Sequence, residues 1–477
     1  MKRNILTKKI IFTACVLSLL QLSCKKLVEV DAPVTSTNSS NVYQADGTAA
    51  AVLTGIYSNM SSTFLIDGTS LNSFMSSYAG LSADEFTLYP GASSGLLAYY
   101  HNDLSNIINP NTWTNAYPYI YIINSAVDGL NGSSGLTPAI KQQLLGEAKF
   151  LRAFYYFYLT NLYGDVPLLT GTDYKVNSLA ARTAQATVYK QIIADLQDAQ
   201  SSLSTNYLDG DIQTLSSDRI RPTPWAASAM LARVYLYLGD WADAESAAST
   251  VINDSATYSL SPLNAVFLAN SSEAIWQLQP VNAGWNTEDA RFFIMTSAGP
   301  NAAHPVYLSN SLLNSFEPTD QRAISGNWVQ SLTVGANTYV YPYKYKVNTQ
   351  GAPLSEYQMV LRLGELFLIR AEARAQQGNI SGAQSDLNRI RSRAGLGNTL
   401  ASSQSDLITA IQHERQVELF SEWGHRWLDL KRTKTVDAVM GVATVQKGWI
   451  WSTGQQLYPI RLTELQADPN LVQNTGY

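Results

Sequence analysis

Residues 224–252, PWAASAMLARVYLYLGDWADAESAASTVI, carry the pattern that decides the fold. Within this stretch Ala232, Tyr235, Gly239 and Ala244 follow one another at steps of three, four and five residues. This spacing is the signature of a tetratricopeptide repeat, in which small residues let two antiparallel helices approach and the glycine turns the chain between them. The stretch therefore predicts a pair of packed helices.

A second segment, residues 360–394, repeats the spacing with Ala371, Arg374, Gly378 and Ala383, although Arg374 stands where the motif prefers tyrosine. Two such pairs are too few to form a stable stack alone. Apolar residues at three- and four-residue steps predict further amphipathic helices, which could supply the remaining pairs. The helices that could form these pairs cover residues 112–130, 138–163, 187–203 and 404–431, and another helix of small apolar residues is expected over 48–60.

The helical pattern stops between about residue 255 and residue 355, in a stretch rich in Asn, Ser, Gly, Pro and aromatic residues. A structureless loop of this length is improbable. We therefore predict a subdomain of short strands and loops, inserted on one face of a helical scaffold made of residues 41–254 and 356–477. In residues 339–345, YVYPYKY, four alternating tyrosines would share one side of a strand, and we expect that row to pack on the helices.

The N-terminus has the layout of a secretory signal peptide. Basic residues up to Lys9 precede an apolar run, residues 10–22, that is too short to span a bilayer. Ser23-Cys24 follows, and a cysteine in this place is what bacterial lipoprotein processing requires. We expect cleavage of residues 1–23, acylation of Cys24 and a flexible leader over residues 24–40; an ordinary signal peptide with an incidental cysteine is the alternative. Because Cys15 is removed, neither a disulfide nor a thiolate zinc site is expected.

The composition is typical of an exported protein surface and argues against nucleic acid as the main partner. Residues 1–23 hold four basic and no acidic residues, so their removal takes the net charge from −5 to −9. An acidic chain offers no basic stripe for phosphates. Charged residues make up only 14% of the chain, while 27 tyrosines and many amides and hydroxyls supply the polarity.

Two patterns could indicate an enzyme, and both have simpler explanations. Residues 91–95, GASSG, match the G-x-S-x-G nucleophile motif, but they lie in a Ser/Gly-rich loop after Tyr89-Pro90. Glu414, Glu418 and Glu422 would share a helix face like paired acid and base carboxylates. The arginines around them favour an ion-pair network instead. We expect no catalytic residue, metal or cofactor.

Five ordered blocks of the chain resemble the SusD/RagB nutrient-uptake lipoproteins of Bacteroidetes. They are residues 146–169, 224–252, 361–378, 413–432 and 458–477, and with the cysteine they span nearly the whole mature chain. The resemblance implies four tetratricopeptide-like helix pairs and an outer-membrane lipoprotein facing the cell exterior. It also implies a non-enzymatic protein that captures oligosaccharides, or less often other nutrients, for a SusC-like TonB-dependent transporter.

Aromatic residues outside the helical pattern are the candidates for contacting such a ligand. A sugar ring has an apolar face that stacks on aromatic rings and a polar edge that bonds amides and hydroxyls. Trp285, in the polar turn NAGWNTED, is the strongest candidate. The others are Tyr89, Tyr99, Tyr100 and His101 in one predicted loop, and Asn286, Phe292, Tyr307 and Trp328 in the insertion.

Two other functions stay open at the level of the sequence. A periplasmic tetratricopeptide scaffold would bind only protein and would bury Trp285 and Trp328. A glycan-active hydrolase would depend on a specific carboxylate or serine.

Overall fold

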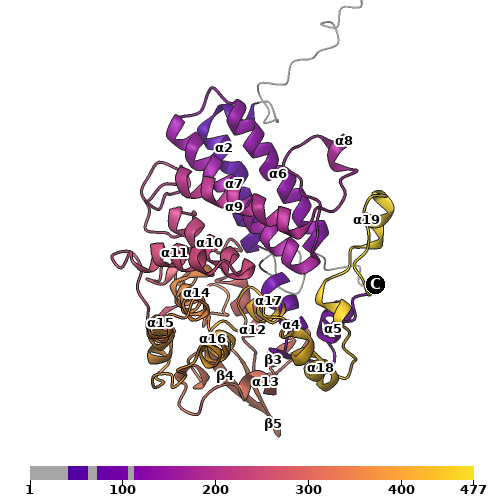
Figure 1. The fold of residues 1–477 in the computed structure, drawn as a ribbon, viewed down its shortest axis with the longest axis vertical. Helices are drawn as coiled ribbons and strands as arrows, with labels where there is room; N and C mark the ends of the chain where they lie inside the picture. Colours follow the sequence, from indigo (N-terminus) through magenta and orange to yellow (C-terminus); the bar gives the residue numbers. More distant parts are fainter. Residues whose placement is uncertain (1–40, 63–71, 73, 106–111) are drawn as a thin grey trace, which may run out of the picture.

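The computed structural model describes residues 41–62, 72, 74–105 and 112–477, so Cys24 and the predicted leader lie outside the described residues. Most of the described chain is helical (Figure 1). The fold is the mostly helical, tetratricopeptide-like scaffold that the sequence predicts, with an irregular region between its two halves.

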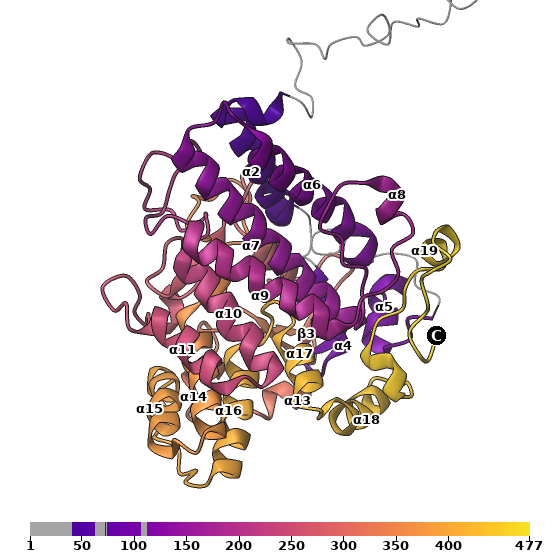
Figure 2. The same cartoon turned by 45° about the horizontal axis from the view of Figure 1, so that its top comes forward.

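The helical scaffold is a stack in which each helix packs on the next, seen from top to bottom in Figure 2. The packing order is α6, α7, α9, α10, α11, α14 and α15, with α16 on α14 and α2 on α6 and α7. The bounds are α2 Asp46–Ser62, α6 Thr112–Gly132, α7 Pro138–Tyr163, α9 Gln185–Ser202, α10 Pro224–Leu238, α11 Trp241–Ile252, α14 Leu363–Gln376, α15 Ile380–Arg393 and α16 Gln404–Glu418.

The central helix α7 shows why these residues form this stack. Pro138 occupies its first turn, where a missing N–H costs nothing. Residues 150–160 are buried all the way round, because α6 and α9 pack on two sides of the helix. A helix that is apolar on every face is stable only inside such a stack.

Both tetratricopeptide pairs form as predicted. Gly239 and Gly378 end the first helix of each pair with φ of +76° and +78°, a conformation that glycine adopts without strain. Arg374, the departure from the motif, binds Glu245 of α11 (2.7 Å) and Asp386 of α15 (2.8 Å). The arginine therefore ties its helix to both neighbours.

The insertion contains short strands, as predicted, and they form three two-stranded antiparallel sheets with residues 86–88 from before it and residues 358–362 from just after it. The pairs are β1 with β3, β2 with β6, and β4 with β5. The strands are β1 Phe86–Leu88, β2 Ala274–Leu278, β3 Val306–Leu308, β4 Val329–Val334, β5 Asn337–Pro342 and β6 Gln358–Arg362. Short helices, α12 Glu288–Phe293 and α13 Asn310–Leu313, lie between them. Strand β6 leads directly into α14, so the insertion is anchored to the stack.

The C-terminal segment returns to the N-terminal part of the chain. The helices α4 Gly80–Ser82 and α5 Ser94–His101 lie beside α17 His425–Arg432 and α18 Val436–Gln446, and α19 Leu462–Ala467 follows (Figure 1). The hydroxyls of Ser82 and Tyr458 are 2.8 Å apart. None of the helices within the described ranges is long and apolar enough to cross a bilayer.

The predicted helix over residues 404–431 is interrupted, which corrects the sequence-based expectation. Helix α16 ends at Glu418 and α17 begins at His425. Between them Ser421, Trp423 and Gly424 have φ between +45° and +67°, which no α-helix accommodates. The break turns the Trp423 indole inward, where its N–H donates to the Met359 carbonyl (2.7 Å).

The predicted tyrosine row is also divided. Strand β5 ends at Pro342, so only Tyr339 and Tyr341 belong to it. Tyr341 and Tyr345 are buried, while Tyr339 and Tyr343 stay half-buried. Tyr339 is therefore available for a surface site.

Candidate functional site

Partly exposed aromatic side chains from distant parts of the chain meet beside the β1–β3 sheet. The register of this sheet pairs Thr87 with Tyr307, and the backbone N–H of Tyr89 donates to the Pro305 carbonyl (2.7 Å). The segment that leads into α5 therefore lies against the insertion. This pairing brings Tyr100 of α5 to the strand that carries Tyr307.

Five side chains gather here in two contacting sets, which together we call the aromatic surface: Tyr100, His101 and Trp449, and Tyr307 with Tyr339. The rings of Tyr307 and Tyr339 meet edge to face, with centroids 5.1 Å apart. The rings of His101 and Trp449 are stacked at 5.0 Å, with 2° between their planes. The ring centroids of Tyr100 and His101 are 5.6 Å apart. Burial raises the pKa of Tyr100, and the neighbouring Tyr307 phenol adds to that rise.

The members of the aromatic surface keep part of their surface in solvent. Trp449 is 43% exposed, and the other four are half-buried. The Lys447 ammonium lies 4.9 Å from the Tyr100 ring centroid and donates to the carbonyls of Leu81 and Ala83. Burial lowers the pKa of this lysine to about 7. The arrangement offers ring faces with polar groups beside them, as a sugar ring requires.

The structure places four predicted site residues at or next to this surface. Tyr100, His101 and Tyr307 belong to it. Tyr89 is half-buried in the preceding segment, where its ring covers Gly91 so closely that a Cβ there would lie 2.6 Å from it. Tyr89 therefore borders the site and also packs on its own loop.

Trp285 is partly exposed but lies elsewhere, in the turn before α12. The Arg291 guanidinium is 4.5 Å from its ring centroid. Arg291 is itself paired with Glu288 (2.7 Å). Trp285 stays a candidate platform apart from the aromatic surface.

Trp328 and Asn286 have interior roles, contrary to the expectation that they face a ligand. Trp328 is 0% exposed, and its indole N–H donates to the Leu263 carbonyl (2.9 Å). The Asn286 side chain accepts from the backbone N–H groups of Ser355 and Glu356 (2.9 and 3.0 Å). These side chains offer no surface to a ligand because they hold the insertion together.

Tyr99 and Phe292 are also buried, because both belong to the hydrophobic core. Tyr99 packs edge to face on Phe74 (5.4 Å) and Tyr458 (5.3 Å) inside the hydrophobic core. Phe292 is 0% exposed and packs against Phe293 at 5.0 Å. Residues 94–101 form a helix, not the predicted loop, so adjacent tyrosines point in different directions.

Sequence reasoning missed Trp449 and the part played by Tyr339. Trp449 lies in the segment KGWIW, residues 447–451, just after α18. Apolar residues in a glycine-containing segment beyond a helix were the available signal. The alternating tyrosines predict that Tyr339 packs on the helices, but β5 lies against β3, and this brings Tyr339 to Tyr307.

Neither enzyme-like pattern forms a reactive centre. The Ser93 hydroxyl caps α5 by accepting from the Leu96 N–H (3.4 Å), and its φ of −63° is not that of a strained nucleophile turn. Glu414 and Glu418 are 0% exposed, and Arg322 binds both, at 2.7 and 2.9 Å. The ion-pair network is confirmed.

The partners of this network differ from the arginines near it in sequence. Glu422 lies beyond the end of α16 and pairs with Lys344 and Arg362. Arg362 also binds Glu418 (2.6 Å). The network therefore joins the insertion to the helical stack.

Comparison with protein families identifies the chain. Residues 269–477 match the family model described as the SusD family, and residues 70–236 match one described as starch-binding associating with outer membrane. The chain belongs to the SusD/RagB family.

Relatives in this family align with most of the length of the chain. SusD-like protein P25 of Formosa agariphila is 23% identical over 95% of this chain and 97% of its own. SusD-like protein P2 of the same organism is 27% identical over 76% of this chain and 80% of its own.

Two solved structures have the same fold as this chain. A SusD superfamily protein from Bacteroides vulgatus superposes with a TM-score of 0.75 at 19% identity, covering 91% of this chain and all of that one. A laminarin-binding SusD-like protein superposes with a TM-score of 0.72 at 23% identity, with the same coverage.

Proposed function

We propose that this SusD/RagB family member captures oligosaccharides outside the cell and passes them, chemically unchanged, to a SusC-like TonB-dependent transporter in the outer membrane. The observation that carries the proposal is the aromatic surface. It brings together rings from α5, from strands β3 and β5 of the insertion, and from the segment after α18, and rings held by their neighbours lose little entropy when a ligand binds.

The aromatic surface suits a neutral sugar chain. Its edge-to-face rings present both faces and edges, so several sugar C–H groups can stack at once. His101, half-buried beside Trp449, bonds the Lys447 backbone through one ring nitrogen and can offer the other to a hydroxyl group. A shallow site of this kind gives micromolar to millimolar affinity, which allows the release that delivery requires.

The relatives suggest which ligand to test first. One structural neighbour binds laminarin, and one matching family model is described as starch-binding. We therefore choose laminarin and starch oligosaccharides as probes.

The test is calorimetric titration of the chain beginning at residue 25 and of its Tyr307→Ala and Tyr339→Ala variants. Loss of a stacking ring should weaken binding by about three- to tenfold, corresponding to roughly 0.7–1.4 kcal/mol. Tyr121→Ala is the matched control, because Tyr121 is 52% exposed on α6. Equal affinities in all four proteins would remove the aromatic surface from the proposal.

The anchor and the cell-surface location need a separate test. Cys24→Ala should release the protein from the outer-membrane fraction, because the acyl chains would be lost. Added protease should cleave the lipidated protein on intact cells. Protection from that protease, together with no sugar binding, would favour the periplasmic scaffold.

A further inference from the structure

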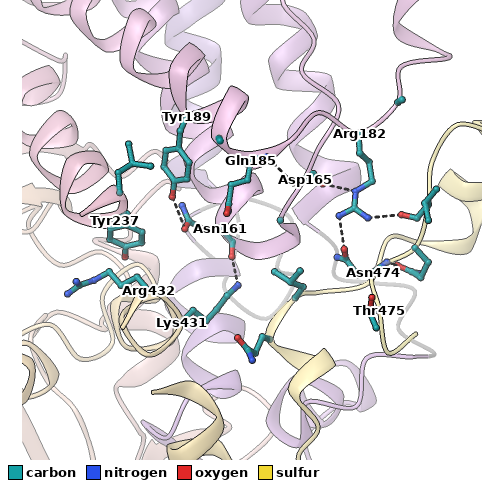
Figure 3. Close-up of a pocket in the computed structure, with 18 of the residues that line it drawn as sticks. Asn161, Asp165, Arg182, Gln185, Tyr189, Tyr237, Lys431, Arg432, Asn474 and Thr475 are labelled. Atoms are coloured by element: carbon teal, nitrogen blue, oxygen red, sulfur yellow. Dashed lines mark hydrogen bonds between the residues drawn. The ribbon is translucent and has the colours of Figure 1, made fainter. Parts of the chain in front are cut away.

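A large cavity lies away from the aromatic surface, where the stack meets the C-terminal tail. Its volume is about 870 Å³, within the range of small-molecule sites. The end of α7, the helices α9, α10 and α17, and residues 470–475 surround it (Figure 3). Nothing in the proposed capture of neutral sugar chains uses this cavity.

Lys431, from α17, places its ammonium in this cavity with few partners. It donates to the backbone carbonyl of Asn161, as Figure 3 shows. Within the described part of the chain no carboxylate pairs with it, whereas Lys149 and Lys344 each have one. Its neighbour Arg432 is already paired with Glu372 and Asp429 (2.7 and 2.6 Å).

The Tyr237 hydroxyl, on the same side of the cavity in Figure 3, is a second unused donor. Its oxygen is enclosed and has no hydrogen-bond partner among the described residues. The ring is held edge to face by Phe157, with centroids 4.9 Å apart. An enclosed hydroxyl without a partner is costly, so a ligand atom that bonds it gains affinity.

The other groups around these donors are already occupied. The Tyr189 hydroxyl donates to Asn161 Oδ1 (3.0 Å). Arg182 donates to the Val472 carbonyl (2.7 Å) and to Asn474 Oδ1 (2.6 Å). Arg182 therefore fixes the tail as one wall of the cavity and is not available as a free cation.

Amide side chains, the Asp165 carboxylate and a few apolar residues line the rest of the cavity, and Asp165 accepts from the backbone N–H of Gln185 (2.8 Å). The amides are Gln185, Gln456, Asn470 and Gln473, and each already donates one hydrogen bond within the protein. An amide carries both donors and an acceptor, which suits the hydroxyl groups of a sugar. A carboxylate or sulfate could then meet Lys431 and Tyr237 while the ring hydroxyls meet the amides.

We propose that this cavity binds an acidic sugar unit, with its carboxylate or sulfate held by the Lys431 ammonium and the Tyr237 hydroxyl. The inference deepens the proposed function, because it gives the protein a second site for a charged saccharide. A hydrogen bond from a charged donor to an anion contributes more than one from a neutral donor. We therefore expect loss of the Lys431 ammonium to weaken binding more than loss of the Tyr237 hydroxyl.

The test is titration with a uronic acid oligosaccharide, a sulfated oligosaccharide and a neutral oligosaccharide of equal length. Lys431→Met should weaken binding of the acidic ligand by about tenfold or more, and Tyr237→Phe by about threefold to tenfold. Lys149→Met is the matched control, because Lys149 pairs with Asp198 on the surface (2.5 Å). Circular dichroism checks that each variant is folded, and Tyr237→Phe keeps the packing of the ring.

The outcomes separate this site from the aromatic surface. Tighter binding of the uronate or of the sulfated ligand, lost in Lys431→Met and kept in Tyr307→Ala, supports the cavity and identifies its anion. Failure of both acidic ligands to bind, or binding unchanged in Lys431→Met and Tyr237→Phe, overturns it. Neutral-sugar binding that depends on Tyr307 would survive that result, so the two proposals fail separately.

Discussion

Glu85 is a buried carboxyl group next to strand β1, on which the aromatic surface depends. Burial raises its pKa to about 8, with the neighbouring Asp84 charge adding to the rise. The folded protein therefore binds a proton here that the unfolded chain has lost above pH ~4.5. The contribution of Glu85 to stability is present below that pH and is lost as the pH rises through about 8.

Replacing Glu85 with glutamine should remove this dependence. We expect Glu85→Gln to match the wild type near pH 5 and to exceed its free energy of unfolding by about 2 kcal/mol or more at pH 8.5. Urea denaturation at several pH values measures both. The amide oxygen can still accept from the Ser421 N–H, as Glu85 does at 3.3 Å.

Asp84 is the control for this prediction, with the opposite sign. Burial alone would raise the pKa of its carboxyl, but the hydrogen bonds and charge of Arg426 (2.7 Å) lower it. Asp84→Asn should therefore destabilise the protein at neutral and alkaline pH. Equal pH profiles for wild type and Glu85→Gln would contradict the buried, protonated state of Glu85.

The sequence is least informative about which individual side chains are buried and which are exposed. Tyr99 and Tyr100 are adjacent and chemically identical, yet one is core and the other belongs to the aromatic surface. Only the short helix α5 decides between them, because neighbouring residues on a helix point about 100° apart. Trp328 shows the same limit, since its burial depends on partners such as Leu263, 65 positions away.

At the scale of elements, Gly378 tests the tetratricopeptide turn. Its φ is +78°, and an added Cβ would find nothing within 4 Å. Gly378→Ala should therefore cost about 1 kcal/mol through backbone strain alone, and Gly378→Asn less. Thermal denaturation measures the difference.

Gly397 provides the matched control for that turn. An added Cβ also meets nothing there, but its φ lies outside the left-handed region. Gly397→Ala should leave stability unchanged or raise it slightly. A similar loss in both variants would mean that the φ of Gly378 is not the cause.

Periodicity predicted the long helices well and the strands poorly. The predicted bounds of α7, residues 138–163, agree with the structure, and those of α9 differ by two residues or fewer. The bounds of such helices follow from apolar periodicity and end signals within the segment, such as Pro138, whereas the stability of α7 depends on the helices packed around it. Strand β1 has three residues, and its partner β3 begins at Val306, so no local pattern could pair them.

At the scale of the whole molecule, we expect the stack and the insertion to unfold as one cooperative unit. Helices α11 and α14 pack directly together although about a hundred residues separate them in sequence. Glu418 of α16 joins the parts by binding Arg362 of β6, Arg322 of the insertion and Arg393 of α15. These arginines hold the pKa of Glu418 far below its usual range, against the effect of its burial.

Glu418→Gln should therefore destabilise the insertion and the stack together. It leaves buried guanidinium groups without their shared carboxylate, at a cost of about 3 kcal/mol or more. Hydrogen exchange should speed up in β6, residues 358–362, and in α15, residues 380–393, by similar factors. Glu317→Gln is the control, because Glu317 binds Arg391 with a side chain 38% exposed, and such pairs contribute about 1 kcal/mol or less. Faster exchange in β6 alone would show that the insertion unfolds independently, and the aromatic surface would then rest on a movable part instead of a rigid scaffold.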